Sequence, residues 1–380
     1  MRDIRDIKAA VVGTGFIGVV HVEALRRLGI EVTGIVGSTA ERAAEKSKAA
    51  GLPAPYPSFE AMLADPAVEV VHLTTPNRLH FEQARAALAA GKHVVCEKPL
   101  GMDSTETAEL VRLAEQSGLV HAVNINIRFY AQVQETRARV QAGEIGDVRL
   151  ISGGYLQDWL LLDTDWNWRL DPAEGGSLRA VGDIGSHWLD LVQYVTGRRV
   201  EAVMADLTTF IPIRKQPTGP VETFTGGGAV GETVDTPMET EDTAGILLRL
   251  SGGARAVMTV SQVSAGRKNQ LSFQVDGSER ALAWNSEVPE DLWIGHRGRP
   301  NELLKRERGD HPPGHAEGFP DTFKYLYRAV YGAVAAGGPS SEPDYPTFAD
   351  GHEEALIADA IARSHAEQRW VAVDPVPQEV

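Results

Sequence analysis

Cysteine is nearly absent from this sequence. Cys96 is the single one among 380 residues, which excludes an internal disulfide and any zinc site built from several cysteines. It lies within an apolar strand pattern, where a small buried side chain is the ordinary outcome. A chain that needs no disulfide is typical of a reducing compartment, and we expect a cytoplasmic protein.

Long apolar runs and targeting segments are absent too. No stretch approaches the ~20 apolar residues that cross a bilayer. The first ten residues, MRDIRDIKAA, carry charges of both signs and lead directly into a strand pattern, unlike a signal or transit peptide. We therefore expect no membrane partner.

Positive charge is scarce. The chain has 37 Lys+Arg against 52 Asp+Glu, a formal net charge of −15. Nucleic acid and anionic lipid repel such a surface, so we expect neither as a partner, and solubility is the simplest reason for the excess of acid. Hydrophobic residues make up 43% of the sequence, which suits packed cores in a chain long enough for two domains.

Strand and helix patterns alternate regularly in residues 1–125. Apolar, β-branched runs are followed by segments whose apolar residues recur at helical spacing. Strands are predicted at 8–15, 31–37, 68–76, 92–99 and 119–126, and helices at 18–29, 39–51, 80–91 and 104–118. Short links between such elements imply right-handed crossovers and a parallel sheet. The first domain, 1–125, is therefore predicted to be a Rossmann dinucleotide-binding domain.

Longer strands that alternate apolar and polar residues follow in residues 126–380. They are predicted at 148–159, 200–211, 242–250, 254–264, 269–277 and 280–287, with helices at 183–197, 321–337 and 350–368. This pattern predicts an α+β domain for substrate binding, built on a large open antiparallel sheet. Residues 212–240, rich in Gly, Pro and Thr, are predicted to form a long loop or lid. Because an open sheet has a face that must be covered, we expect a homodimer or homotetramer through this sheet.

A glycine motif joins the first strand to the first helix. It reads Gly13-Thr14-Gly15-Phe16-Ile17-Gly18 and matches G-x-G-x-x-G in the strand–turn–helix context that dinucleotide binding requires. The first glycine permits the tight turn, the second lets the backbone approach a pyrophosphate, and the third allows close helix packing. The helix N-terminus favours the anion. A glycine-rich turn without a ligand is the weaker interpretation.

The end of the second strand lacks the Asp or Glu that ordinarily binds the ribose of NAD. The segment reads Gly37-Ser38-Thr39, with Arg42 in the next helix. Ser38, Thr39 and Arg42 are able to bind a 2′-phosphate, which favours NADP slightly over NAD. The alternative is that Ser38 or Thr39 only caps the helix.

Further motifs identify a family by resemblance. Thr75-Pro76-Asn77 with His80, then Glu97-Lys98-Pro99, then Gly182–His187 are similar in order and spacing to motifs of the Gfo/Idh/MocA oxidoreductases. The resemblance covers essentially the whole chain, and the stretch Tyr155–Trp159 resembles members that oxidise sugars at C3. Together with the glycine motif and the end of the second strand, the resemblance implies an NAD(P) site. The residues of this site are Gly13, Gly15, Phe16, Ile17, Gly18, Ser38, Thr39, Arg42, Thr75, Pro76, Asn77, His80, Glu97 and Lys98.

Three residues are predicted to be catalytic. Oxidation of a secondary alcohol needs a base for the hydroxyl proton. Asp183 and His187 are four apart on a predicted helix and share one face, so we assign proton abstraction to His187 and its orientation to Asp183. Lys98, after a strand of the cofactor domain, is predicted to stabilise alkoxide character on the reacting oxygen. An ordinary hydrogen-bonded pair or a metal site with His80 or His121 are the alternatives, and no H-E-x-x-H motif supports metal.

The substrate is predicted to meet polar and aromatic side chains of the second domain. Aromatic faces stack on sugar C–H surfaces, and amide, carboxylate and guanidinium groups bind hydroxyls. The predicted substrate-binding residues are Arg128, Tyr155, Gln157, Asp158, Trp159, Trp168 and Arg169. For the tryptophans, the alternative is that they pack a loop or a subunit contact.

These observations together predict an NAD(P)-dependent dehydrogenase. Its substrate is expected to be a secondary hydroxyl of a sugar, glycoside, anhydrosugar or inositol. Two alternatives stay open. One is a regulator that binds a dinucleotide without turnover, which the presence of both Lys98 and His187 disfavours. The other is redox-neutral glycoside cleavage or epimerisation on a bound NAD.

Overall fold

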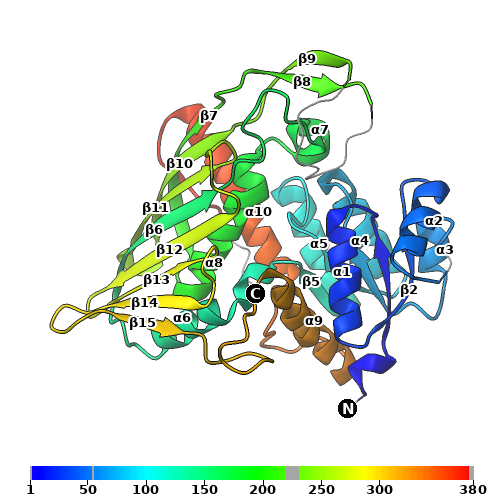
Figure 1. Cartoon of the computed structure of the whole chain (residues 1–380), viewed down its shortest axis with the longest axis horizontal. Coiled ribbons are helices and arrows are strands. Elements are labelled where there is room, and N and C mark those ends of the chain that lie inside the picture. The colour runs from blue at the N-terminus through cyan, green and yellow to red at the C-terminus, as the bar shows by residue number, and fades with distance from the viewer. Residues whose placement is uncertain (1, 54, 220–230, 376–380) are drawn as a thin grey trace. The chain divides into compact units, whose positions relative to one another are not determined.

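The computed structural model describes residues 2–53, 55–219 and 231–375, in which the chain forms two compact units (Figure 1). The first unit comprises Met1–Asn126 and Pro320–Ala355, and the second comprises Ile127–Phe319 and Leu356–Val380. The first holds a parallel sheet with helices and the second a large, mostly antiparallel sheet, which confirms the predicted fold class. Among the described helices, none has the length and apolarity that a membrane span requires.

The first unit is built on a five-stranded parallel sheet of apolar strands. The strands are β1 (Lys8–Val12), β2 (Glu31–Val36), β3 (Val70–Leu73), β4 (His93–Cys96) and β5 (His121–Val123), in the order β2-β1-β3-β4-β5. β1 pairs in parallel with both β2 and β3, so the chain reverses its direction of winding there. In such sheets ligands bind outside the carboxyl ends of the strands at the switch point. The segments that follow β1 and β3 are therefore the first place to look for a site.

Helices of the first unit lie beside this sheet (Figure 1). They are α1 (Phe16–Arg27), α2 (Ala40–Ala49), α3 (Phe59–Leu63), α4 (His80–Ala89), α5 (Ser104–Ser117) and α9 (Phe319–Ala336). α5 is capped by Asp103, whose carboxylate accepts from the Thr105 and Glu106 N–H groups, one residue before the Ser104 start that the sequence pattern suggests. Glu106 reaches back to the Met102 N–H at 2.8 Å, which completes a reciprocal cap.

Residues 320–355 return to the first unit, whereas the sequence pattern alone gives a single boundary near residue 125. α9 presents aromatic side chains to α1 and β3. The Tyr327 ring lies 5.3 Å from the ring of His21 and 4.8 Å from that of His72, centroid to centroid. Phe323 and Tyr327 are fully buried in these contacts. A boundary read along the sequence misses this return because the packing partner is just over three hundred residues away in the chain (327 − 21 = 306).

The second unit is built on a nine-stranded sheet. In spatial order its strands are β15 (Glu302–Lys305), β14 (Asp291–Gly295), β13 (Ala281–Asn285), β12 (Gln270–Gly277), β6 (Val148–Leu156), β11 (Arg255–Ser261), β10 (Thr243–Leu250), β7 (Val200–Thr208) and β16 (Val371–Ala372). The β6–β11 pair is parallel, and the other pairs are antiparallel. Helices α6 (Ala131–Gln141), α8 (Ser186–Thr196) and the C-terminal part of α10 (Phe348–Glu367) complete the apolar core.

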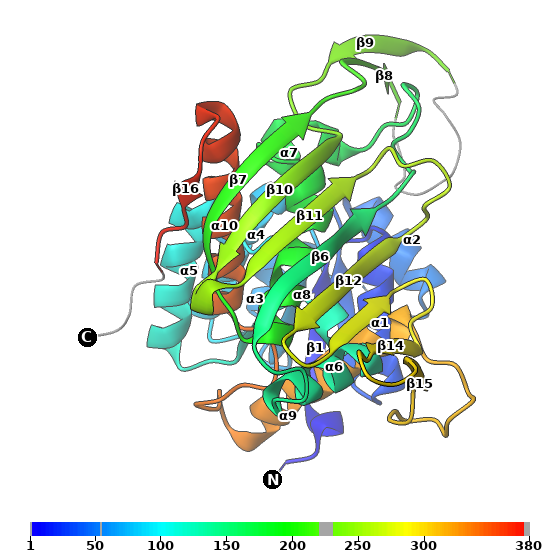
Figure 2. The ribbon, with the colours of Figure 1, turned by 90° about the vertical axis from the view of Figure 1, so that its left-hand side faces the viewer.

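The sheet of the second unit has one open face. Figure 2 shows its strands side by side with α8 behind them and no described helix of this unit in front. On β10 and on β11 up to Val260, buried residues alternate with more exposed ones, as a half-covered sheet requires. Leu247 and Val257 are cross-strand neighbours on the open face and are 46% and 44% exposed. This face therefore presents apolar surface between polar residues.

Part of the predicted loop over 212–240 is a hairpin. β8 (Ile213–Pro217) and β9 (Thr233–Pro237) pair antiparallel over five residue positions. Residues 220–230 of the prediction lie outside the described residues. The sequence does not predict these strands because every residue of β9 is exposed or half-exposed, so β9 carries no apolar pattern.

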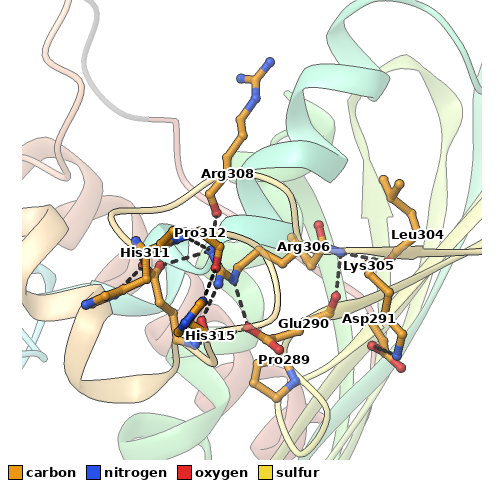
Figure 3. Close-up of polar contacts among 12 residues, drawn as sticks. Pro289, Glu290, Asp291, Leu304, Lys305, Arg306, Arg308, His311, Pro312 and His315 are labelled. Atoms are coloured by element: carbon orange, nitrogen blue, oxygen red, sulfur yellow. Dashed lines mark hydrogen bonds and ion pairs between the residues drawn. The ribbon is translucent and has the colours of Figure 1, made fainter.

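A loop held by Arg306 follows β15 (Figure 3). The guanidinium donates to Glu290 Oε1 at 2.8 Å and to the carbonyl oxygens of Arg308 at 2.9 Å and His315 at 2.5 Å. The Glu317 carboxylate accepts from the His311 N–H at 2.9 Å. Arg306 is buried although the loop around it is exposed, so one guanidinium replaces the regular backbone pairing that this segment lacks.

Candidate functional site

The glycine motif forms the tight turn between β1 and α1. Gly13 has φ 118°, a conformation that L side chains rarely adopt. A Cβ on Gly13 would lie 2.4 Å from Thr74 Oγ1, after β3, and a Cβ on Gly18 would lie 2.4 Å from the Gly13 carbonyl oxygen. Both positions therefore exclude a side chain for reasons of space, which agrees with the roles predicted for them.

Gly15 differs from the other two glycines because its surroundings are open. No described heavy atom beyond its chain neighbours lies within 4 Å of a Cβ built there. Gly15 is also the N-cap residue of α1, and it provides no side-chain hydrogen bond to the first turn. The first N–H groups of a twelve-residue helix therefore face an approach that no side chain blocks, and a dinucleotide pyrophosphate fits this arrangement.

The end of β2 shows that the capping interpretation applies to Thr39. Thr39 is the N-cap of α2, and its Oγ1 accepts from the Arg42 N–H at 3.2 Å. A hydroxyl that accepts one hydrogen bond can also donate one, so this cap and a ligand contact do not exclude each other. Ser38 and Arg42 are exposed. Glu41 adds a carboxylate to this turn, and its own N–H and the Thr39 side chain lower its pKa. A Cβ on Gly37 would approach the Ala43 nitrogen to 2.9 Å, so this position does not accept a side chain without movement of α2.

His80 connects the Thr75-Pro76-Asn77 loop to the Glu97-Lys98-Pro99 loop. Its Nδ1 lies 2.7 Å from the Pro99 carbonyl oxygen, and its Nε2 lies 2.9 Å from the Thr75 carbonyl oxygen. The side chain is fully buried, which lowers its pKa. Both ring nitrogens thus face protein carbonyls. In this structure His80 therefore links and supports two loops, whereas the sequence predicts a direct cofactor contact.

Glu97 is buried as well, behind the loop that carries Lys98. Its Oε1 accepts from Asn124 Nδ2 at 2.5 Å and lies 3.0 Å from His21 Nε2, and its Oε2 accepts from the Lys98 N–H at 3.2 Å. Burial acts to raise the pKa of Glu97, but the hydrogen bond and charge of His21 outweigh it, and the pKa lies below the usual value. Glu97 is therefore a charged support for the loop, while Lys98 itself is half-buried.

In the second unit, a π-helical turn precedes α8 and carries Asp183. The turn spans Val181–Gly185, and α8 begins at Ser186, where the sequence pattern had suggested one regular helix. The carboxylate of Glu241 accepts from the Arg179 N–H at 3.1 Å and the Val181 N–H at 2.8 Å, so it caps the start of the turn. π-turns are rare and occur frequently at functional sites. The apolar residues of this turn and of α8 are buried in the core and comprise Ile184, Trp188, Leu191, Val192 and Val195.

Asp183 and His187 are half-buried polar residues of this helix start. Asp183 Oδ1 accepts from Arg169 Nε at 3.0 Å, and its Oδ2 accepts from Gln262 Nε2 at 2.9 Å. His187 is half-buried, and its ring lies 6.0 Å from that of Tyr155, centroid to centroid. Asp183 is thus held from two sides by a loop and a strand end, while the imidazole stands beside an aromatic ring.

Three of the predicted substrate residues form one hydrogen-bonded cluster with Asn269, which precedes β12. Tyr155 OH donates to Asn269 Oδ1 at 2.7 Å and Gln157 Nε2 donates to the same atom at 2.8 Å. Gln157 Oε1 in turn accepts from Trp159 Nε1 at 2.7 Å. The Trp159 ring is half-buried. Tyr155 is the member of the cluster that lies beside His187, and amide and aromatic groups together are what a sugar site contains.

The other predicted substrate residues are engaged with protein groups. Arg128 forms a bidentate ion pair with Asp190 on α8, so it braces the helix instead of presenting a free guanidinium. Asp158 accepts from Lys268 Nζ at 2.6 Å. The guanidinium of Arg169 stacks over Trp168, 4.4 Å from the ring centroid, while it holds Asp183. Among these residues Arg169 is the one that contacts Asp183, and a role of the others toward substrate stays a prediction.

Three fully buried charged side chains form a cluster next to the segment that leads into the Asp183 turn. Asp242 forms ion pairs with Arg179, just before the π-turn, and with Arg214 of β8, the latter at 2.8 Å. Arg214 also donates to the carbonyl oxygens of Leu160 at 2.9 Å and Leu162 at 2.8 Å. One carboxylate therefore links the hairpin, the loop after β6 and the segment that leads into the Asp183 turn.

Sequence reasoning missed several residues of these clusters. Asn269 and Gln262 were overlooked because isolated amides carry no motif. His21 was missed although it follows the glycine motif by three residues, because a histidine in an apolar helix pattern is ordinarily a core residue. The spacing of His21 and Gly18 on one helix face was the only available signal.

Comparison with known proteins adds the family. A family model described as an oxidoreductase family with an NAD-binding Rossmann fold matches residues 7–125, and one described as a GFO/IDH/MocA C-terminal domain matches residues 133–283. The chain belongs to the Gfo/Idh/MocA oxidoreductases. The resemblance inferred from the motifs is thereby confirmed, and with it the oxidoreductase class and the NAD-binding character of the first unit.

Relatives and solved structures of this family cover the whole chain. Levoglucosan dehydrogenase of Pseudarthrobacter phenanthrenivorans is 29% identical over 98% of this chain and 100% of the relative. A structure of levoglucosan dehydrogenase in complex with NADH and levoglucosan has a TM-score of 0.87 at 29% identity, over 97% of this chain and 100% of that one. An inositol dehydrogenase homologue from Azotobacter vinelandii, in complex with NADH and myo-inositol, has a TM-score of 0.81 at 26% identity, over 96% and 97%.

Proposed function

We propose that this oxidoreductase oxidises a secondary hydroxyl of a sugar, glycoside, anhydrosugar or inositol with NAD(P). The observation that carries the proposal is the His187 imidazole beside the Tyr155 ring, which is itself hydrogen-bonded into the cluster of Asn269, Gln157 and Trp159. Hydroxyl groups bind amides and a pyranose or cyclitol ring stacks its C–H face on an aromatic side chain. Relatives named for levoglucosan, 1,5-anhydro-D-fructose and inositol support this substrate class.

The residues divide the chemistry between them. Bound NAD(P) supplies the nicotinamide that accepts a hydride from the C–H group. His187 takes the hydroxyl proton, and Asp183, fixed by Arg169 and Gln262, keeps negative charge beside the helix start where the imidazolium forms. Lys98 stabilises negative charge on the reacting oxygen. Tyr155 is a poor alternative base because burial raises its pKa and its hydroxyl donates to Asn269.

The test is a substrate screen with both dinucleotides. Purified protein is mixed with pyranoses, methyl glycosides, levoglucosan and inositols, and nicotinamide absorbance is followed with NAD and with NADP. Turnover of at least one class supports the proposal. Tight dinucleotide binding without net reduction, together with cleavage or epimerisation of a glycoside, identifies the redox-neutral reaction. Binding with no chemistry in any arm contradicts an enzymatic role.

We expect Ser38→Asp to shift cofactor preference toward NAD. Ser38 is exposed at the end of β2, while Gly37 is closed by Ala43, so position 38 is where a carboxylate fits. The wild type is expected to use both dinucleotides with a small preference for NADP, because Ser38 and Arg42 remain accessible. A repulsion of about 1.4 kcal/mol between two like charges changes a ratio tenfold. The ratio of kcat/KM for NAD and NADP should therefore change about tenfold or more, and not in the neutral control Ser38→Asn. A wild type that rejects NADP refutes this account of Ser38 and Arg42.

We also propose that the open sheet face forms a homodimer or homotetramer. Leu150, Leu247 and Val257 expose apolar surface in neighbouring strands of this face. Light scattering at micromolar protein should give a dimer or a tetramer, and Val257→Lys should lower that mass by burying an unpaired charge in the contact. Val288→Lys, at an equally exposed valine away from the central strands, is the control. A monomeric wild type contradicts the proposal.

A further inference from the structure

A chain of buried hydrogen-bonding side chains crosses the first unit and ends at Glu97. Its members come from four elements: Tyr331 on α9, His72 on β3, His21 on α1 and Glu97 after β4. Tyr331, His72 and His21 are 0% exposed, and Glu97 is 7% exposed. Polar groups buried to this degree are destabilising unless they form hydrogen bonds, and these four side chains find their partners in one another.

The three contacts of the chain have equal lengths. Tyr331 OH lies 3.0 Å from His72 Nε2, His72 Nδ1 lies 3.0 Å from His21 Nδ1, and His21 Nε2 lies 3.0 Å from Glu97 Oε1. Each is a normal hydrogen-bond distance. The rings of His21 and His72 meet edge to face, at an interplanar angle of 89°.

Donor and acceptor capacity fixes the direction of the bond to Glu97. An ionised carboxylate only accepts, so His21 donates to Glu97 from Nε2. Burial lowers the pKa of His72 well below its usual value, so this ring is neutral and carries one proton. A charged His21 donates from Nδ1 to His72 Nδ1, and His72 Nε2 then donates to the Tyr331 hydroxyl oxygen; a neutral His21 reverses these two bonds. In either case each nitrogen of the two rings has a partner, and His21 donates to Glu97.

This chain offsets the cost of a buried carboxylate beside Lys98. Glu97 receives N–H donors from His21, from Asn124 and from the Lys98 backbone. The titratable groups that act on Glu97 from the neighbouring elements are His21, Lys98 and His80, and Cys96 and Tyr327 are themselves influenced by its charge. Loss of the His21 donor leaves burial as the dominant influence and favours the protonated carboxyl.

We propose that Tyr331, His72 and His21 are positioning residues, which hold the ionised Glu97 in place so that Glu97 fixes the backbone of Lys98. This role rests on the function proposed above for Lys98. Catalysis depends on geometry at the scale of an ångström, and partners one step removed from a reacting group commonly contribute ~10–100-fold. The three residues belong to the Rossmann unit, so they act on the reaction without belonging to the substrate surface of the second unit.

The decisive comparison is His21→Leu against His21→Gln. Leucine fills the site but cannot donate, whereas the glutamine amide retains an N–H for Glu97. We expect kcat of His21→Leu to fall ~10–100-fold at neutral pH, and to recover as the pH is raised and Glu97 ionises, since its pKa is raised in this variant. His21→Gln should restore most of the activity and the wild-type pH profile. A pH-independent loss in both variants indicates a packing defect and overturns the proposal.

A second readout does not require turnover. The infrared difference spectrum of His21→Leu minus wild type should show the carbonyl band of a protonated carboxyl group at neutral pH, and that of His21→Gln minus wild type should not, since a difference spectrum cancels the contribution of other buried carboxyl groups such as Glu241. The band must vanish in His21→Leu/Glu97→Gln. Its absence from His21→Leu overturns the proposal whatever the activity. If the wild type turns over no polyol, the proposed function fails while this arm still tests the buried chain.

Tyr331→Phe tests the far end with a change that keeps the ring. It removes the hydroxyl at His72 Nε2 and should lower kcat in the same pH-dependent manner, by less than His21→Leu. Tyr345→Phe is the matched control, because Tyr345 is also buried in this unit and its hydroxyl has no hydrogen-bond partner among the described residues. Equal effects of the two tyrosine variants contradict a chain that transmits position to Glu97.

Discussion

His187→Ala is expected to lower kcat by ~10²–10⁴, the range for removal of a positioned acid–base group. The imidazole is half-buried on the helix start that carries Asp183, and alanine leaves the hydroxyl proton without an acceptor there. Dinucleotide binding should be nearly unchanged, because the glycine turn and the N-terminus of α1 belong to the other unit. Steady-state kinetics and dinucleotide fluorescence titration on one preparation separate the two effects.

The pH profile distinguishes a base from a structural residue. A histidine acts as a base only when neutral, so wild-type kcat/KM should fall as the pH drops through an imidazole pKa, ordinarily near ~6.5. This fall of kcat/KM at low pH should be missing in His187→Ala. If the variant keeps near-normal kcat and the wild-type fall at low pH, the proton goes elsewhere, and Lys98 becomes the first residue to examine.

Asp242→Asn is expected to destabilise the second unit by ~3–5 kcal/mol, the usual cost of removing one partner from a buried ion pair. Arg179, Arg214 and Asp242 are all 0% exposed at their side chains. Asparagine keeps the shape but leaves two guanidinium groups without a negative charge between them. Urea unfolding followed by tryptophan fluorescence measures this unit selectively, because all seven tryptophans of the chain lie in it.

The control for this variant is Asp235→Asn on β9 of the same hairpin. Asp235 is 70% exposed at its side chain, and its pair with Lys215 has an N···O distance of 3.5 Å, so its loss should leave the urea midpoint unchanged within error.

The pH dependence of the Asp242→Asn effect gives a further check. Burial acts to raise the pKa of Asp242, but Arg179 and Arg214 hold it below the usual value. Its stabilisation is therefore present above the unfolded-state pKa of ~3.9 and is lost as the pH falls, so wild type and variant should converge in acid. Equal midpoints of Asp242→Asn and wild type at neutral pH contradict the role of this cluster.

Much of the first unit was predictable because its signals are local. Each parallel strand is a short apolar run, each helix repeats its apolar residues at 3.6 spacing, and the glycine turn joins the two kinds of pattern. The sites of Gly13 and Gly18 follow from this motif. The choice between a ligand and a cap at Thr39 did not, since one hydroxyl serves either purpose and only the coordinates show it accepting from Arg42.

The rest depended on pairs that no local pattern reveals. Arg128 looks like a substrate ligand until Asp190 is placed beside it, and His80 looks like a cofactor ligand until two carbonyls meet its ring. The Asp183 turn is capped by Glu241, nearly sixty residues further along the chain (241 − 183 = 58), so no local pattern shows how its start is stabilised. A polar residue whose partner lies far away in the sequence is therefore easily predicted to bind a ligand, although in the structure it supports the fold.

The return of residues 320–355 to the first unit constrains how the chain folds as it is synthesised. When residues 1–126 leave the ribosome, the aromatic side chains of α9 that cover His21 and His72 do not yet exist. The Rossmann sheet can form from local pairs, but its buried histidines remain in contact with water until the entire nine-stranded sheet except β16 has been made. The core of the Rossmann unit is thus begun first and completed late, after almost the entire second unit has been synthesised.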